Sequence, residues 1–245
     1  MLSKAPRGTK DITPKDVYKW HYVEKKFREI CALYGYEEIR TPIFENTEVF
    51  ARSVGDTTDV VQKEMYSFTD RGDRQLSLKP EGTAGVIRSF IENKMYADTQ
   101  PTKLYYITPC FRYERPQAGR QRQFHQFGIE VLGSDGPSVD AEVISLAVQF
   151  FNEMGLKNLS VNINSVGCPT CREEYNRKLK EYLDKKVDVL CETCLERKDK
   201  NPMRVIDCKN PHCKENLQDI PFMIDHLCDD CKEHFEKLQT YLKEM

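Results

Sequence analysis

The stretch FRYERPQAGRQRQFHQFGIEVLG, residues 111–133, decides the fold of the chain around it. Two runs of alternating residues flank a polar loop with one glycine, which predicts a β-hairpin. Side chains alternate between the faces of a strand, so each run can be split into two sets. One face of the second run should be core, because it carries His125, Phe127, Ile129 and Val131. The opposite face carries Arg122, Phe124, Gln126, Gly128 and Glu130.

This second face is unusual for a solvated sheet surface. Arg112 and Glu114 of the first run join it, so arginines, carboxylates, an amide and an aromatic ring share one surface. Arginine suits bidentate binding of phosphate, and a ring beside it can stack on a base. Gly128 leaves a gap at which a ligand could approach the backbone. The face predicts a nucleotide pocket; the alternative is a solvated face held by Arg–Glu pairs.

Outside the hairpin, patterning predicts a mixed fold. Helices are expected over about 16–34, 46–53, 82–95 and 137–154, and a hairpin over 64–79. Short strands are expected over 37–44, 104–108, 111–114, 122–132 and 159–164. Consecutive strands are joined by tight turns, so we predict an α+β fold with an antiparallel sheet flanked by helices.

Composition and charge exclude several classes of protein. The 245 residues are 39% hydrophobic and 31% charged, which allows a buried core, and the net charge of −2 excludes a generally basic nucleic-acid binder. Positive charge is local: five lysines and arginines lie between Lys103 and His125, against one acid, Glu114. No apolar run reaches the roughly 20 residues of a membrane helix, and the N-terminus lacks an apolar signal core. We therefore expect a cytoplasmic protein without a membrane segment.

Cysteines mark a second domain. A change in composition near residue 165 divides the chain into 1–165 and a mostly helical, Cys-rich region, 166–245. The pairs Cys168/Cys171 and Cys191/Cys194 have the spacing of a structural zinc site. The remaining four, Cys208, Cys213, Cys228 and Cys231, would form a second site. The alternative is that these are reduced thiols on helices.

Several segments together resemble one enzyme family. FRYERP followed by RQFHQFGIEVLG resembles motif 2 of class II aminoacyl-tRNA synthetases in the form that histidyl-tRNA synthetases have. RGTKDITP (7–14) resembles the N-terminal segment of that family, and residues 34–68 resemble motif 1 together with the stretch after it. LSLKPEGTAGVIR (76–88) resembles its amino-acid-binding loop. The resemblance implies the class II catalytic fold for 1–165 and an insertion domain for 166–245.

The resemblance also implies a role for each matching residue. Arg112 would contact the ATP α-phosphate and the carboxylate of histidine, and is the expected catalytic residue. Glu114 would bind the adenine amino group, Phe124 would stack on adenine, and Arg120 would join the ATP site. The ammonium of histidine would be held by the segment Glu81, Gly82, Thr83 and by Gln126. Glu130 would accept a hydrogen bond from the imidazole.

Partners are implied by the same resemblance. It implies the substrates histidine, ATP with Mg²⁺, and tRNA(His), with the Arg115–Arg122 loop near the acceptor end of the tRNA. Motif 1 implies a homodimer with Pro42 near its interface. Members of the family continue beyond the region matched here, with motif 3 and an anticodon-binding domain. We therefore expect a partial catalytic domain that does not aminoacylate efficiently by itself.

Other interpretations of these residues stay open. Glu81 could be an acid favoured at a helix N-terminus, and Thr83 could be a capping hydroxyl. The whole chain could belong to a non-catalytic relative, the regulatory subunit of ATP phosphoribosyltransferase. It could also be a zinc-dependent RNA-binding module, which would bind RNA in a salt-sensitive way without histidine or ATP.

Overall fold

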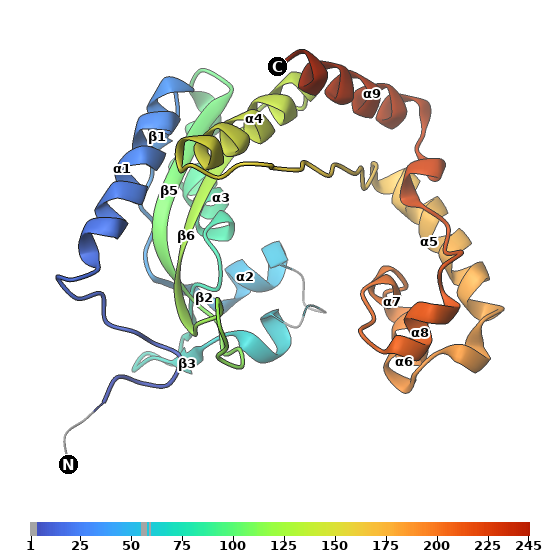
Figure 1. The fold of residues 1–245 in the computed structure, drawn as a ribbon. Coiled ribbons are helices and arrows are strands. Elements are labelled where there is room, and N and C mark those ends of the chain that lie inside the picture. Colours follow the sequence, from blue (N-terminus) through green and yellow to red (C-terminus); the bar gives the residue numbers. More distant parts are fainter. Residues whose placement is uncertain (1–3, 55–57, 59) are drawn as a thin grey trace. The chain divides into compact units, whose positions relative to one another are not determined.

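The fold is seen in a computed structural model that describes residues 4–54, 58 and 60–245. Four residues of the segment that resembles motif 1, at 55–57 and 59, lie outside the described residues. The chain divides into two compact units, shown as a ribbon in Figure 1. Unit 1 comprises Met1–Asp135 and Glu142–Asn158, and unit 2 comprises Gly136–Ala141 and Leu159–Met245. Each unit has its own apolar core.

Unit 1 is built on the long antiparallel pair β5 (Thr102–Phe111) and β6 (Gln123–Leu132), which confirms the predicted hairpin (Figure 1). The register places Tyr106 opposite Gly128 and Thr108 opposite Gln126. A two-residue strand, β1 (Glu37–Glu38), pairs with β5 in parallel. The α+β class with a mainly antiparallel sheet is therefore as predicted.

One detail of the strands was predicted wrongly. Residues 104–108 and 111–114 were expected as two strands, but β5 runs through Pro109 without a break and ends at Phe111. The N–H of Phe111 points away from β6, because it donates to the carbonyl of Lys79 at 2.9 Å. Pro109 lies two residues earlier and therefore faces the same way. Its missing N–H removes no hydrogen bond of the β5–β6 ladder, which is why the strand tolerates it.

The apolar face of β6 is covered by helices. α1 (Val17–Leu33) and α4 (Pro137–Glu153) supply Phe27, Ile30, Leu146 and Phe150 to a core that includes Phe127, Ile129 and Val131. The rings of Phe27 and Phe127 stack with centroids 5.1 Å apart. Because this face is sealed, the polar face of β6 is the one left for a site.

The polar face is bordered by α3 (Thr83–Glu92) and a smaller sheet. That sheet has the order β2-β4-β3 and comprises β2 (Phe44–Asn46), β3 (Ser67–Thr69) and β4 (Gln75–Leu78). β3 and β4 form the predicted hairpin over 64–79. The connections carry α2 (Thr47–Val54), a π-helical turn at Val60–Glu64 and a 3-10 turn at Met95–Ala97. β4 leads directly into the PEGT segment that begins α3.

Unit 2 is helical throughout its described elements. They are α5 (Pro169–Asp184), α6 (Glu192–Lys200), α7 (Met203–Ile206), α8 (Pro211–Asn216) and α9 (Asp229–Glu244), with 3-10 turns at Val187–Val189 and Met223–His226. The strand predicted at 159–164 is wrong, since none forms there. Its apolar residues, such as Leu159 and Val161, are exposed and have no neighbouring strand among the described residues.

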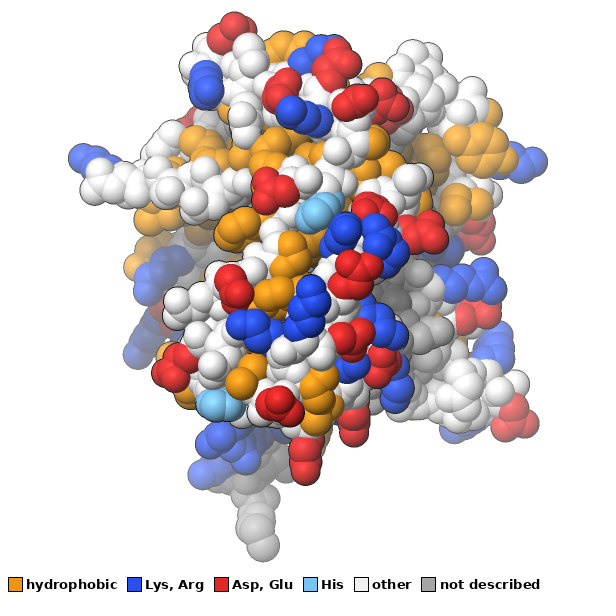
Figure 2. Space-filling model, turned by 90° about the vertical axis from the view of Figure 1, so that its right-hand side faces the viewer, with side chains coloured by type: hydrophobic (Ala, Val, Ile, Leu, Met, Phe, Trp, Pro, Cys, Tyr) orange, Lys and Arg blue, Asp and Glu red, His pale blue; other side chains and the backbone are white. Residues whose placement is uncertain are grey.

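Charged side chains of both signs are intermingled on the surface that Figure 2 shows. In unit 2, Lys180 pairs with Asp199 at 2.8 Å, and Lys198 pairs with Asp184. These pairs agree with the small net charge of the chain. None of the helices in the described part of the chain is long and apolar enough to cross a membrane.

Candidate functional site

The start of α3 is bound to the polar face of β6. The N–H of Gly82 donates to Oε1 of Gln126 at 2.8 Å, and the hydroxyl of Thr83 donates to Oε1 of Glu130 at 2.7 Å. These contacts join residues 44 and 47 positions apart in the chain. The structure thus brings together four residues that the resemblance assigned to histidine.

Glu81 is held at the N-terminus of α3. Its two carboxylate oxygens accept hydrogen bonds from the N–H groups of Thr83 and Ala84, each at 2.8 Å. A carboxylate is favoured here by the helix dipole, so the interpretation of Glu81 as an acid at a helix N-terminus is confirmed. The hydroxyl of Thr83 does not cap the helix but binds Glu130. An anchored Glu81 keeps lone pairs with which it can also accept from an ammonium group.

Glu130 lies in a half-buried polar niche. Burial raises its pKa, and the hydrogen bonds from Thr83 and Tyr106 act in the opposite direction. The hydroxyl of Tyr106 lies 3.4 Å from the same Oε1 that Thr83 contacts. A carboxylate with fixed donors on one oxygen can offer its other oxygen to a ring N–H of a ligand.

Tyr106 is the residue that the sequence interpretation missed. Alternation along the strand indicates only that Tyr106 packs in the sheet, but its hydroxyl lies between Thr83 and Glu130 at the centre of the niche. Its ring is buried between Gly82 and Gly128, where a Cβ on either glycine would overlap the ring. The gap expected at Gly128 for a ligand is therefore wrong, because Tyr106 fills it. The feature that could have identified Tyr106 is the strand register, which places Gly128 opposite it.

Arg112 is oriented by three neighbours. Its Nε donates to the carbonyl of Pro80 at 2.9 Å, and its guanidinium carbon lies 5.4 Å from the centroid of the Phe124 ring. Nη1 lies 3.9 Å from Oε1 of Glu114. Anchoring through Nε directs the rest of a rigid guanidinium at one place, which suits an anionic ligand.

The loop after β5 satisfies part of its charge internally. Arg120 pairs with Glu114 at 3.1 Å, and Arg122 donates from Nε to the carbonyl of Glu114 at 3.2 Å. Arg122 also stacks on Tyr113, with its guanidinium carbon 3.8 Å from the ring centroid. The N-terminal segment closes this loop, since Gly8 accepts a hydrogen bond from the N–H of Arg122 at 2.7 Å. Glu114 and Arg120 can reach a nucleotide only by exchanging part of this pairing.

Lys79 is a second residue that periodicity did not single out. It is 1% exposed, and burial lowers its pKa. Its Nζ lies 3.3 Å from the carbonyl oxygen of Thr41. Lys79 directly precedes the PEGT segment (80–83), and its carbonyl accepts a hydrogen bond from the N–H of Phe111 at 2.9 Å. Its position indicates support of the segment that carries Glu81.

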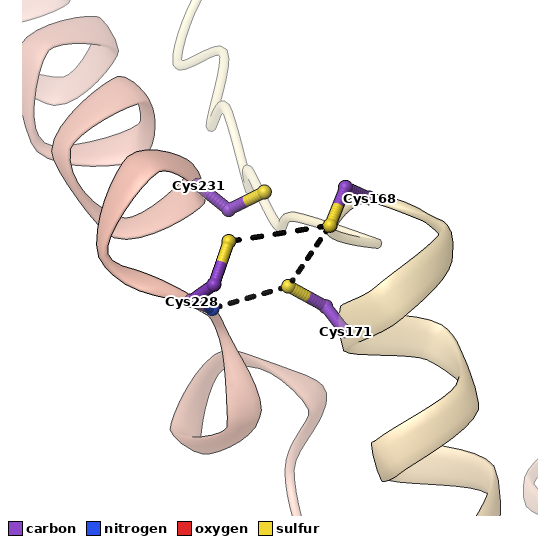
Figure 3. A group of neighbouring side chains, drawn as sticks. All are labelled: Cys168, Cys171, Cys228 and Cys231. Atoms are coloured by element: carbon purple, nitrogen blue, oxygen red, sulfur yellow. Dashed lines mark hydrogen bonds between the residues drawn. The ribbon is translucent and has the colours of Figure 1, made fainter.

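The cysteines of unit 2 form two groups of four. One group, here called the outer tetrad, is Cys168, Cys171, Cys228 and Cys231, whose sulfurs point toward one another in Figure 3. The inner tetrad is Cys191, Cys194, Cys208 and Cys213. The expected grouping of 168/171 with 191/194, and of 208/213 with 228/231, is not the one that the fold brings together. The chain folds back so that the start of α9 lies beside the start of α5. The spacing of the cysteines along the chain does not indicate this contact.

Comparisons with known proteins point to one family. A family model described as histidyl-tRNA synthetase matches residues 8–202. A histidine–tRNA ligase of Clostridioides difficile (strain 630) is 80% identical over all of this chain and 58% of its own length. The crystal structure of the apo histidyl-tRNA synthetase of S. aureus superposes with a TM-score of 0.78 at 41% identity, over 99% of this chain and 55% of that one.

A more distant structure shares the fold alone. It is described as an ATP phosphoribosyltransferase regulatory subunit/histidyl-tRNA synthetase from Bacillus halodurans C. The TM-score is 0.67 at 22% identity, over 100% of this chain and 65% of that one. The chain spans 58% of the length of the Clostridioides difficile relative.

Proposed function

The chain belongs to the histidyl-tRNA synthetase family, and we propose that it forms the histidine- and ATP-binding part of an enzyme that activates histidine and transfers it to tRNA(His). One observation supports this most. Gln126 and Glu130 hold the start of α3 on the same sheet face that carries Arg112 and Phe124. An amino-acid niche and an anion-binding arginine are thus neighbours on one surface.

The niche around Glu130 fits the side chain of histidine. Glu130 would accept a hydrogen bond from an imidazole N–H, and Glu81 with Gln126 would receive the α-ammonium. Tyr106 and Thr83 would fix the orientation of Glu130 through their hydroxyls. An apolar amino acid of similar size would leave this half-buried carboxylate unpaired, which favours its rejection.

Arg112 would act on the first step. The carboxylate of histidine attacks the α-phosphorus of ATP, so a C–O–P linkage forms and pyrophosphate leaves with its bond electrons. Negative charge grows on the α-phosphate oxygens, and a guanidinium held by Pro80 and Phe124 is placed to stabilise it. Phe124 and Glu114 would bind the adenine, and Arg120 the phosphates. Mg²⁺ would accompany ATP as the counter-ion of its phosphates.

The wider arrangement is taken from the family. We assign residues 1–165 to the catalytic core and 166–245 to an insertion domain, with the Arg115–Arg122 loop facing the acceptor end of tRNA(His). A homodimer in the cytoplasm goes with this function. Zinc in the Cys-rich region would be structural, because four thiolates leave no open coordination position.

A chimera tests the proposal. Residues 1–245 replace the corresponding region of the Clostridioides difficile relative, to which they are 80% identical. Histidine-dependent exchange of pyrophosphate into ATP is then measured. We expect exchange with histidine and none with other amino acids, and Glu130→Gln should raise the KM for histidine. Glu29→Gln, on the exposed face of α1, is the matched control.

The outcome separates the alternatives. A folded chimera that gives no histidine-dependent exchange would refute the proposal and favour a non-catalytic, regulatory-subunit-like role. Salt-sensitive RNA binding by the chain that neither histidine nor ATP influences would favour the zinc-dependent RNA-binding module.

A further inference from the structure

The geometry of the two tetrads matches single tetrahedral metal ions. A Zn–S bond of about 2.3 Å sets the sulfur–sulfur edge of a tetrahedron at about 3.8 Å. In the outer tetrad Cys168 lies 3.5 Å from Cys171 and 4.0 Å from Cys228, sulfur to sulfur. In the inner tetrad the sulfurs of Cys191 and Cys208 are 3.9 Å apart. A disulfide would need about 2.0 Å, and all ten cysteines are free.

Backbone amides are directed at the sulfurs of both tetrads. The N–H of Cys228 donates to Sγ of Cys171 at 3.1 Å, and that of Cys191 donates to Sγ of Cys213 at 3.2 Å. Asn210 donates to Sγ of Cys208 at 3.4 Å. A hydrogen bond to sulfur is worth most when the sulfur is a charged thiolate, as a metal ligand is. Chance proximity of apolar thiols would not require these donors.

The composition of unit 2 suits a domain that metal ions stabilise. Four of the eleven buried residues in its core are cysteines, namely Cys171, Cys194, Cys208 and Cys213. Two of its helices are short, since α7 has four residues and α8 has six. Helices of this length are marginal without tertiary support, and small domains commonly use a metal for it.

We propose that unit 2 binds two Zn²⁺ ions, one in the outer tetrad and one in the inner tetrad. This grouping is nested, because the inner tetrad lies between the two Cys pairs of the outer tetrad along the chain. The inner ion fixes the α6–α8 region, and the outer ion joins the start of α5 to the start of α9. Neither ion has a catalytic role. The proposal goes beyond histidine activation and does not depend on it.

The ligand set is sulfur alone. His212 is exposed and belongs to neither tetrad, although it precedes Cys213 in the chain. The four sulfurs of each tetrad lie within 4.8 Å of one another, which fits one metal ion better than an iron–sulfur cluster. Thiolates in a tetrahedral set select zinc or iron, and only zinc leaves the protein colourless.

Burial distinguishes the two sites. Cys228 is exposed and only Cys171 of the outer tetrad is buried, whereas three cysteines of the inner tetrad are buried. A chelator can therefore reach the outer ion first. We expect two kinetic phases of zinc release, in which the fast phase belongs to the outer tetrad.

Two matched variants of the chain test the nested grouping by elemental analysis after growth with zinc. One replaces the outer tetrad with serine, and the other replaces Cys168, Cys171, Cys191 and Cys194, so each removes four cysteines. The unaltered chain should hold about two zinc ions. The first variant should keep about one, since the inner tetrad is intact, and the second should keep none. Cys31→Ala, in unit 1, should leave the content at two.

One zinc ion retained by the second variant and none by the first would overturn the nested grouping. That result requires one site made of 168/171 with 191/194 and another made of 208/213 with 228/231. A measurement without substitutions protects against misfolding of the variants. X-ray absorption at the zinc edge of the unaltered chain should give four sulfurs at about 2.3 Å. Zinc content below about half an equivalent, nitrogen in the first shell, or iron in place of zinc would each refute the proposal.

Discussion

Replacing Gly128 with alanine should destabilise unit 1, although alanine is normally the better residue in a strand. A strand glycine usually costs about 0.5–1 kcal/mol relative to alanine. Here the new Cβ would lie 2.7 Å from Cε1 of Tyr106 and closer still to Cζ and Oη. Ordinary contacts of a Cβ are 3.4–4 Å. The ring cannot retreat, because Gly82, the N-cap residue of α3, packs against its other side.

Overpacking of a core costs about 1–3 kcal/mol, which outweighs the gain in strand propensity. The single tryptophan provides the assay, since Trp20 packs against His125 of β6 with ring centroids 4.6 Å apart. The middle of both ranges leaves a net cost of about 1.3 kcal/mol. Urea unfolding followed by Trp20 fluorescence should therefore show a midpoint lowered by about 0.6 M for a slope near 2 kcal/mol/M. Gly72→Ala, in the β3–β4 turn, has no such contact and should change stability by less than about 0.5 kcal/mol.

A double-mutant cycle decides whether Tyr106 is the cause. In a Tyr106→Ala background, Gly128→Ala should cost nothing or stabilise slightly, because the obstacle is gone. An unchanged midpoint for Gly128→Ala alone, or equal costs in the two backgrounds, would refute the reasoning. In the chimera, Gly128→Ala should also raise the KM for histidine, because a displaced ring withdraws its hydroxyl from Glu130.

Three further predictions test the site and the tetrads. Arg112→Lys keeps the charge but loses the planar guanidinium, so pyrophosphate exchange by the chimera should fall by about 10²–10³-fold. Arg28→Lys on α1 is the control, and equal exchange rates for the two variants would contradict the assignment. Burial raises the pKa of Glu130 above its ordinary 4.5, so the stability that its protonated form contributes is fully present below pH 4.5 and is lost as pH rises through the raised pKa. The free energy of unfolding of the Glu130→Gln variant should lack this decline between pH 4.5 and the raised pKa. The same pH dependence in the variant and in the unaltered chain would count against the assignment. Chelation of zinc should reduce the helical circular dichroism of unit 2 while Trp20 fluorescence stays constant, because the two units have separate cores. Loss of both signals together would argue against independent units.

Much of unit 1 could be predicted from short-range patterns. The hairpin at β5–β6, the helix α1 and the separation of the two faces of β6 follow from alternation and helical spacing, which depend only on neighbours in the chain. The strand predicted at 159–164 failed for the same reason. Alternation gives a segment the capacity to pair, but a strand also needs a partner, and the described chain offers none there.

The site needed more than pattern. Alternation placed Arg112, Gln126 and Glu130 on one face, and the resemblance added Glu81, Thr83 and the role of each residue. The hydrogen bonds from Gly82 to Gln126 and from Thr83 to Glu130 depend on β5–β6 register and on how α3 meets the sheet. The sequence shows no sign of the place of Tyr106 in the site, because that place depends on two glycines that are distant from each other in the chain. Packing of a ring between two backbones leaves no periodic signal.

The sequence by itself determined which residues carry the chemistry: the polar face of β6, the PEGT segment and the eight cysteines of unit 2. Those properties belong to single residues and to their immediate neighbours. Only the tertiary structure decided which of them meet. The contact between Cys171 and Cys228 closes a separation of 57 residues, and the contact between Thr83 and Glu130 closes one of 47. Such pairings are fixed by the packing of whole elements, and spacing along the chain does not encode them.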